Sequence, residues 1–464
     1  MWKIKYKSKM KRICILLTLC FLILIGSTLS RVGIMAMNEN DYQQSREAFS
    51  RIKENKSYYQ QILGNVYDTV GNPILISDTV IDESVLNYNK SYSHLLGNIH
   101  LDDNGLLNCN YQTLTDQNSH DAVNHKGYSL SLTLNDDLQR FAYSLTEGKR
   151  ASIVVLRRHS GEILALTSTY VEDFDLSGEL TTDRLSHYNS AEEPIWMPEY
   201  LNTYAPGSCQ KIFSSAVAYE SGMGGFTIDD IGEVKYGNAI ISNSGGAIYG
   251  KDLGITDAFC VSSNTYFASI FNAMEIGKIR KASSALLLNG SIDTDFGIIH
   301  NSFSFGEYSD FEIGLLGIGQ KNELSSVGLA LMVQGCIDNE IYRPHVIKNT
   351  CITEKDGTIK VVSTTQEEIL ASGMFSDDTC SNVRLLMEHT AKSEGYMLSN
   401  NILGAKSGTA EITVDGIDTD RASLVAYNED YIVVVSVIEE DSFGISNKDI
   451  IEKIFKKLND VDTI

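Results

Sequence analysis

A serine follows a Pro-Gly pair in the stretch Ala205-Pro206-Gly207-Ser208-Cys209-Gln210-Lys211. The Pro-Gly pair predicts a turn, and the apolar residues from Ile212 to Val217 predict a helix that begins beside Ser208. Ser208 and Lys211 then share one face of that helix, because they are three residues apart. A buried lysine at a helix N-terminus has a lowered pKa, so its amine can take the proton of the serine hydroxyl.

Ser-x-x-Lys is weak evidence by itself, since the chain also contains it at Ser8/Lys11 and Ser50/Lys53. We interpret those two copies as accidental, because one lies in a basic N-terminal tail and the other in a charged stretch. For Ser208, a helix start without catalysis is the alternative interpretation.

Two further motifs follow the first along the chain. Ser262-Ser263-Asn264 is a Ser-x-Asn pattern, and Lys406-Ser407-Gly408-Thr409 lies on a predicted strand. Neither is specific alone, because Ser399-Asn400-Asn401 also matches Ser-x-Asn and a lysine beside a glycine is common at a sheet edge. Ser262 follows Ser208 by 54 residues and Lys406 follows Asn264 by 142, and this order of the three motifs favours a serine acyl-transfer enzyme.

With these motifs the chain resembles a class B penicillin-binding protein, from about Leu134 to the C-terminus. Supporting stretches typical of that family's transpeptidase domain are Gly148-Lys149-Arg150 through Gly161-Glu162-Ile163-Leu164-Ala165-Leu166, Ser262 to Phe267, Gly317-Ile318-Gly319-Gln320 and Gly408-Thr409-Ala410-Glu411. Asp68-Thr69-Val70-Gly71 is similar to the family's Asp-Arg-x-Gly but lacks the arginine.

The resemblance implies a role for each motif residue. Ser208 attacks the carbonyl of the penultimate D-Ala of a stem peptide, and Lys211 takes its proton. The backbone N–H groups of Ser208 and Thr409 form the oxyanion hole. Ser262 relays a proton, and Asn264 contacts the substrate amide. The terminal carboxylate is bound by the segment Lys406, Ser407, Gly408 and Thr409. No metal and no organic cofactor are required.

The function that this resemblance implies is peptidoglycan D,D-transpeptidation, with a D-Ala-D-Ala donor, an amine acceptor and inhibition by β-lactams. A membrane glycan polymerase is a candidate partner. A D,D-carboxypeptidase or β-lactamase on the same fold, and a catalytically weak penicillin-binding scaffold or sensor, stay open as alternatives.

The apolar pattern predicts an α+β fold with one antiparallel sheet of about five strands. The expected strands are 151–156, 163–166, 405–413, 422–427 and 431–438, with a long, mostly helical region between the two groups. Asn135 is expected to cap a helix, and a C-terminal helix presents the apolar stripe Ile450, Ile451, Ile454, Phe455 and Leu458.

Four segments make up the predicted domain organisation. They are a cytoplasmic tail (1–12), a membrane anchor (13–37), a small mixed pedestal (38–133) and the penicillin-binding transpeptidase domain (134–464). Six basic residues precede an uncharged stretch from Ile13 to Ser30, which as a helix is about 27 Å long at ~1.5 Å per residue. The basic side places the N-terminus in the cytoplasm and the catalytic domain outside, as a single-pass membrane protein. A cleaved signal peptide is the alternative.

The charge of the outer part argues against nucleic acid as a partner. Without the seven basic residues of the N-terminal segment, 31 Lys and Arg stand against 60 Asp and Glu. Six cysteines lie in this part, and the sequence does not decide whether any of them pair. For Cys209 and Cys260, a redox pair and two small buried apolar residues are the alternatives.

Overall fold

The computed structural model describes residues 62–77, 88–97, 105–116, 126–171, 175, 197–303, 306–354, 356, 358–396, 401–414, 417–439 and 446–461. The chain divides into two units, residues 1–60 and residues 61–464, and every described residue belongs to the second. The predicted tail (1–12) and anchor (13–37) therefore lie outside the described residues. Within the described ranges, no helix has the length and apolar character that a membrane span requires.

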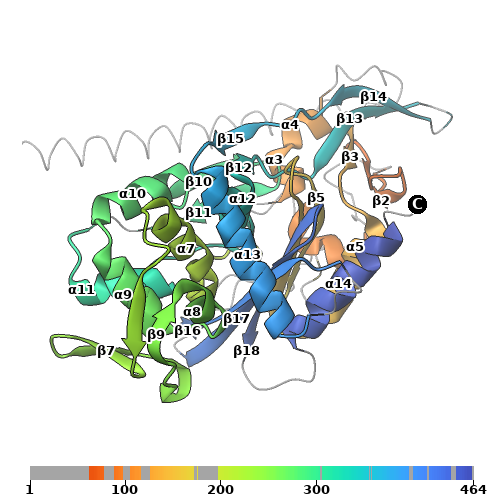
Figure 1. The fold of residues 1–464 in the computed structure, drawn as a ribbon. Helices are drawn as coiled ribbons and strands as arrows, with labels where there is room; N and C mark the ends of the chain where they lie inside the picture. Colours follow the sequence, from red (N-terminus) through yellow and green to blue (C-terminus); the bar gives the residue numbers. More distant parts are fainter. Residues whose placement is uncertain are drawn as a thin grey trace, which may run out of the picture. The chain divides into compact units, whose positions relative to one another are not determined.

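Five antiparallel strands form the main sheet, in the order β16-β17-β18-β4-β5 (Figure 1). They are β4 (Arg150–Arg157), β5 (Ile163–Thr169), β16 (Gly404–Val414), β17 (Ile417–Tyr427) and β18 (Tyr431–Glu439). Two segments far apart in the sequence thus meet in one sheet, and the predicted α+β fold with its five-stranded antiparallel sheet is confirmed. β16 lies at an edge of the sheet.

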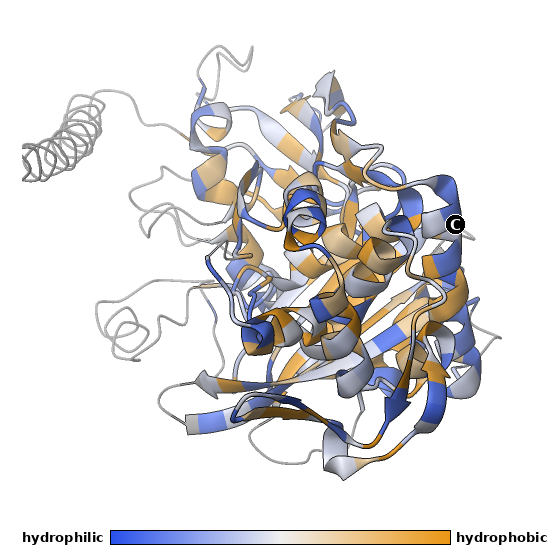
Figure 2. Ribbon diagram, turned by 60° about the vertical axis from the view of Figure 1, so that its left-hand side comes forward, coloured by the Kyte–Doolittle hydropathy of each residue, from blue (hydrophilic) through white to orange (hydrophobic). Residues whose placement is uncertain are grey.

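Alternation along the strands gives this sheet two apolar faces. Ile153 and Val155 of β4 pack with the cluster of α5 (Asp136–Thr146) and α14 (Asn447–Val461), whereas Val154 belongs to the core of the helical region. Figure 2 shows hydrophobic residues concentrated in the central strands and in the helices that cover them. The Asn135 side chain caps α5 by accepting the N–H of Leu138 at 2.9 Å, which confirms the predicted helix start.

Helices and short hairpins fill the chain between β5 and β16. The helices are α7 (Lys211–Glu220), α8 (Ile255–Cys260), α9 (Asn264–Ala273), α10 (Ile276–Ala285), α11 (Asp310–Ile318), α12 (Ser326–Asp338) and α13 (Asp377–Ser393). Two hairpins pair β7 (Glu233–Tyr236) with β8 (Ala239–Ser242) and β10 (Gly290–Thr294) with β11 (Gly297–Asn301). Two further antiparallel pairs enclose other strands and join β6 (Thr227–Asp230) to β9 (Gly250–Gly254) and β12 (Glu340–Tyr342) to β15 (Ile369–Ser372). The predicted helical middle is present, but sequence patterns did not reveal these hairpins.

A second five-stranded sheet contains chain from both sides of the predicted domain boundary at 133/134. Its order is β14 (Ile359–Thr364), β13 (Ile347–Thr353), β3 (Ser129–Leu132), β1 (Val66–Tyr67) and β2 (Pro73–Leu75), and only β1 and β3 run parallel. Short helical segments, η2 (Lys90–Tyr92), α2 (Ser93–Leu96), α3 (Leu106–Cys109) and α4 (Tyr111–Leu114), accompany it. The domain boundary at 133/134 stays a prediction. Residues 347–364, which follow this boundary, pair in one sheet with strands of residues 66–132, which precede it.

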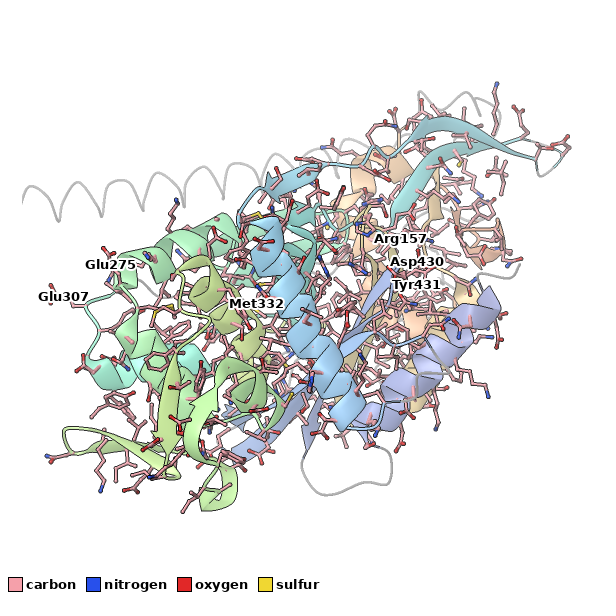
Figure 3. The ribbon with its side chains drawn as sticks, viewed as in Figure 1. Arg157, Glu275, Glu307, Met332, Asp430 and Tyr431 are labelled. Atoms are coloured by element: carbon pink, nitrogen blue, oxygen red, sulfur yellow. The ribbon has the colours of Figure 1, made fainter. Side chains whose placement is uncertain are left out.

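Two arginine side chains contact the end of the main sheet at the β17–β18 turn. Arg157 of β4 lies over the ring of Tyr431, 5.1 Å from its centroid, and the two side chains are labelled beside Asp430 in Figure 3. Arg158 donates its backbone N–H to Asp430 and forms a buried ion pair with Asp338 at the end of α12. The helical region is thereby attached to the sheet by charge as well as by apolar packing.

Candidate active site

Ser208 lies where a tight turn enters α7. A 3-10 turn over Gly207–Gln210 leads directly into the helix, and Gly207 has a φ of +53°, a conformation that favours glycine. A Cβ on Gly207 would lie 2.5 Å from the carbonyl oxygen of Thr409. Because a side chain has no room there, the turn can bring Ser208 directly against β16.

Lys211 is the first residue of α7, and its side chain is fully buried. Its Nζ lies 2.9 Å from Oγ of Ser208, 2.7 Å from the carbonyl oxygen of Ser262 and 2.8 Å from Oδ1 of Asn264. The amine therefore touches the hydroxyl one helical turn before it and the segment that carries the Ser-x-Asn motif.

These contacts suit a neutral amine. A carbonyl oxygen and an amide oxygen can only accept hydrogen bonds, so the oxygens of Ser262 and Asn264 take the two N–H groups of a neutral lysine. The nitrogen lone pair is then left for a hydroxyl, and Oγ of Ser208 at 2.9 Å is nearer than Oγ of Ser262 at 3.1 Å. Burial, together with the charge of Lys406, holds the pKa of Lys211 well below its ordinary value. The geometry and the electrostatics both equip Lys211 to act as a base toward Ser208.

Asn264 is oriented by the hairpin that precedes α8. Its Nδ2 donates to the carbonyl oxygen of Ser242 at 2.9 Å, and this contact leaves Oδ1 facing Lys211. Asn264 is also the first residue of α9, whose N-terminus is capped by the side chain of Ser263. The amide oxygen at Lys211 is thus fixed from two directions.

Ser262 bridges the two lysines of the site. It lies in the turn between α8 and α9 with a φ of +56°, in the left-handed region that residues other than glycine rarely adopt. Its Oγ lies 3.1 Å from Nζ of Lys211 and 3.1 Å from Nζ of Lys406. Because a hydroxyl both donates and accepts, it can pass a proton from one amine to the other.

Lys406 approaches the same hydroxyl from strand β16. Its side chain is buried, and its Nζ also donates to the carbonyl oxygen of Ser407 at 2.9 Å. Burial lowers the pKa of Lys406, while Cys209, Glu394 and Cys260 act in the opposite direction. Two buried ammonium groups that share one hydroxyl repel each other, so a charge on Lys406 favours the neutral form of Lys211.

The rest of the Lys-Ser-Gly-Thr segment lines the site along β16. A Cβ on Gly408 would lie 2.6 Å from the backbone nitrogen of Cys209 and 2.9 Å from that of Ser208, so the strand and the serine turn are in direct backbone contact. Ser407 and Thr409 are exposed and alternate with the buried Lys406 and Gly408. Lys406 and Gly408 thus lie on the side of the serine turn and of Ser262, while the side chains of Ser407 and Thr409 are open to solvent.

Sequence reasoning did not single out the aromatic residues beside the lysines. The ring centroid of Phe267 lies 5.7 Å from Nζ of Lys211, and that of Phe259 lies 5.6 Å from Nζ of Lys406. Both rings are buried, and they contribute to the apolar surroundings that lower the two lysine pKa values. Their positions on α8 and α9 fit ordinary core residues, and the sequence carries no signal that would separate them from the core.

The two cysteines near the site are free thiols. Cys209 lies under β16, with its Sγ 3.4 Å from the carbonyl oxygen of Lys406, and burial raises the pKa of this thiol to about 11. Cys260 instead contacts Nδ1 of His389 at 3.7 Å. Of the two alternatives for Cys209, its contacts favour a small buried residue. In the part of the chain that the structure describes, no three His, Cys, Asp or Glu side chains gather as metal ligands.

Comparison with protein families gives a match over most of the chain. The family model described as the penicillin binding protein transpeptidase domain matches residues 151–460. This range contains all three motifs, the main sheet and α14.

Individual relatives are distant. The chain is 24% identical over 332 residues to penicillin-binding protein PbpB of Mycolicibacterium smegmatis, an alignment that covers 64% of this chain and 46% of that protein. It is 24% identical over 341 residues to peptidoglycan D,D-transpeptidase PbpA of the same organism, covering 68% of each. The match thus spans less than half the length of PbpB.

Among solved structures, penicillin-binding protein A from M. tuberculosis, determined as a penicillin G acyl-enzyme complex, has a TM-score of 0.72 to this chain with 18% sequence identity. The superposition covers 87% of this chain and 100% of that one. At this level of identity the likeness establishes a common fold.

Proposed function

Because the chain belongs to the family of penicillin-binding protein transpeptidase domains, we propose that it is a serine D,D-transpeptidase that cross-links peptidoglycan stem peptides. The observation that carries the proposal is the set of contacts at Lys211. Its buried amine meets the Ser208 hydroxyl at 2.9 Å while two acceptor oxygens occupy its N–H groups. PbpA, to which the chain is similar, carries the name peptidoglycan D,D-transpeptidase.

In the proposed first step, Oγ of Ser208 attacks the carbonyl carbon of the penultimate D-Ala, and its proton passes to Nζ of Lys211. The backbone N–H groups of Ser208 and Thr409 stabilise the oxyanion. The C–N bond to the terminal D-Ala then breaks, and the leaving amine receives the proton through the hydroxyl of Ser262. The products are an acyl-enzyme ester and free D-Ala.

In the second step, the amine of a neighbouring stem peptide attacks the ester carbonyl. Its proton returns through Lys211 to Oγ of Ser208 as the new peptide bond forms. In this proposal Asn264 contacts the donor's amide, and the charge of Lys406 with the hydroxyls of Ser407 and Thr409 binds the donor's carboxylate. A β-lactam enters the same first step, and its ester persists as an inhibited enzyme.

A carboxypeptidase or a β-lactamase on this fold would use the same serine and differ in the second step, where water replaces the amine. A weak penicillin-binding sensor would stop at the acyl-enzyme. The three cases differ in their products, so product analysis separates them. Location in the cell membrane with the catalytic domain outside, next to a glycan polymerase, is part of the proposal and rests on the N-terminal sequence pattern.

The test combines mass spectrometry with product analysis on the full-length protein in detergent. Penicillin should add its own mass once to the wild type and not to Ser208→Ala. Ser50→Ala, which alters another Ser-x-x-Lys copy of the chain, should be labelled like the wild type. A stem pentapeptide with an acceptor amine should then yield a cross-linked product. Free tetrapeptide alone would assign a carboxypeptidase, and labelling that persists in Ser208→Ala would move the nucleophile to another residue.

A further inference from the structure

A buried carboxylate lies behind the Ser-x-Asn motif, on an element that none of the three motifs includes. Asp230 ends β6 in the double hairpin of residues 227–254, and its side chain is 1% exposed. Its Oδ2 accepts the hydroxyls of Ser263 and Thr265, each at 2.7 Å, and its Oδ1 accepts the N–H of Gly232 at 2.9 Å. The carboxylate is thus tied to the first turn of α9, which begins at Asn264.

Asn243 extends this connection to the motif itself. Its Nδ2 donates to both carboxylate oxygens of Asp230, at 2.9 and 3.0 Å, and this fixes which way its amide faces. Its Oδ1 accepts the backbone N–H of Asn264 at 2.8 Å and that of Thr265 at 3.1 Å. A helix N-terminus leaves such N–H groups unpaired, so the hairpin supplies acceptors that α9 lacks.

The same hairpin holds the side chain of the motif asparagine. The carbonyl oxygen of Ser242, next to Asn243, accepts Nδ2 of Asn264 at 2.9 Å. Oδ1 of Asn264 is thereby aimed at Nζ of Lys211, 2.8 Å away. Immediately before this anchored turn stands Ser262, whose left-handed backbone persists only where its surroundings hold it.

We propose that Asp230 and Asn243 are positioning residues for acyl transfer, which hold Asn264 and Ser262 at the distances that Lys211 and Lys406 require. The inference rests on the proposed function and names a part of the machinery that lies outside the three motifs. The two residues touch neither the reacting serine nor a lysine, and act through the start of α9.

The charge of Asp230 is part of this arrangement. Burial opposes its ionisation, but hydrogen bonds from Ser263, Thr265, Gly232 and Asn243 outweigh burial and lower its pKa. The described groups that contact the carboxylate are two hydroxyls, one amide and one backbone N–H, and none of them titrates. In the wild type, the hydrogen bonds of Asp230 should therefore not change with pH near neutrality.

Asn243→Asp should make the hydrogen bonds between residues 230 and 243 depend on pH. The new carboxylate would face Asp230 at about 3 Å, where two negative charges cannot both persist, so the pair takes up one proton. Once protonated, residue 243 again donates to Asp230 and again accepts from the backbone of Asn264. The acylation rate of this variant relative to the wild type should therefore rise as the pH falls.

The experiment measures acylation of the full-length protein by a chromogenic cephalosporin, with the rate constant separated from the affinity by varying the ligand. Asp230→Asn should lower the rate constant at least tenfold, toward the ~10²-fold that a misplacement of about 1 Å can cause. Asn243→Asp should show a similar loss at alkaline pH and a ratio to wild type that grows on acidification. The exchange Asp230→Asn with Asn243→Asp should recover part of the rate, because one carboxylate and one amide face each other again.

The matched control is Asp229→Asn, the same substitution at the neighbouring exposed carboxylate, which should acylate like the wild type. Should Asp230→Asn fail to fold in a thermal melt, Thr265→Val removes one hydroxyl from Asp230 with little change of shape and should slow acylation about threefold or more.

Two results would overturn the inference. One is a wild-type acylation rate in both Asp230→Asn and Asn243→Asp, and the other is a deficit of Asn243→Asp that is equal at every pH. If Ser208→Ala abolishes acylation while these variants do not slow it, only the positioning role fails, and if the wild type is not acylated at all, the proposed function fails.

Discussion

Lys406→Met tests whether the charge of Lys406 sets the basicity of Lys211. The substitution removes an ammonium group and keeps most of the apolar length of the side chain. In the native site both amines lie 3.1 Å from Oγ of Ser262. Two contacts that meet at a tetrahedral hydroxyl oxygen place the two nitrogens about 5 Å apart.

The magnitude follows from Coulomb's law. Two unit charges about 5 Å apart, at an effective dielectric constant of about 20, repel by about 3 kcal/mol. This repulsion disfavours a second charge beside Lys406 and, together with burial, lowers the pKa of Lys211. Because the repulsion is absent in Lys406→Met, we expect the pKa of Lys211 to rise in that variant.

The sign of the pH effect is fixed by the role of Lys211. A base acts only when neutral, so the acylation rate falls as the pH drops below the pKa of Lys211. A higher pKa moves this fall to higher pH, and Lys406→Met should therefore be slow at neutral pH and recover in alkaline solution. Stopped-flow acylation with a chromogenic cephalosporin at saturating concentration, from about pH 6 to about pH 10, measures the profile without the loss of ligand affinity.

Two control variants isolate the charge. Lys406→Arg keeps the cation and should leave the acid side of the profile near its wild-type position. Lys392→Met removes an exposed lysine from α13 and should change neither rate nor profile. If Lys406→Met lowers the rate by one factor at every pH, the charge of Lys406 does not set the basicity of Lys211, and Lys406 acts on the ligand or the proton relay alone.

Further predictions concern the base, the backbone contact and the membrane. Lys211→Met should lower acylation by about 10²–10⁴-fold in an intact-mass time course, because the Ser208 hydroxyl loses its general base; a rate near wild type would exclude that role. Gly408→Ala should slow acylation and cost about 1–3 kcal/mol in thermal or urea unfolding, because its Cβ would lie 2.6 Å from the nitrogen of Cys209. Gly225→Ala, where a Cβ meets no atom within 4 Å, is its control, and equal stabilities would contradict the packing argument. Cell fractionation should find the uncut chain in the membrane with its bulk open to external protease; a mature N-terminus near Asn38 in the medium would contradict the anchor.

The strands of the main sheet could be predicted because their signal is local. Tyr431–Ile438 is apolar except at Ser436 and appears as β18 (Tyr431–Glu439), and Asn135 caps α5 as its position before an amphipathic stretch indicates. The second sheet could not be predicted in the same way. β13 is half-exposed and β14 is mostly exposed, both are of mixed composition, and β3, which pairs with β13, lies more than 200 residues earlier in the chain.

The residues of the candidate site also differ in how far the sequence could predict them. Ser208 and Lys211 are one helical turn apart, so their contact follows from local geometry, and the other motif residues were identified through the resemblance to a family. Asn243 carries no such signal, because Asn243-Ser244-Gly245-Gly246 is typical of a turn and its contacts with Asn264 and Asp230 exist only after folding. Residues that position a site through buried hydrogen bonds are therefore harder to find from sequence than residues that carry its chemistry.

The charge arrangement of the site also explains why a carboxylate is a fitting ligand group. Among the described residues, no ion pair reaches Lys211 or Lys406, and both amines are buried. A fixed acidic partner within hydrogen-bonding distance would raise the pKa of Lys211 and compete for Lys406. In the proposed complex, the ligand's carboxylate pairs with Lys406 without displacing a protein carboxylate. The lack of a fixed acid among the described residues around the two amines also favours the neutral form of Lys211, which the proposed proton transfer requires.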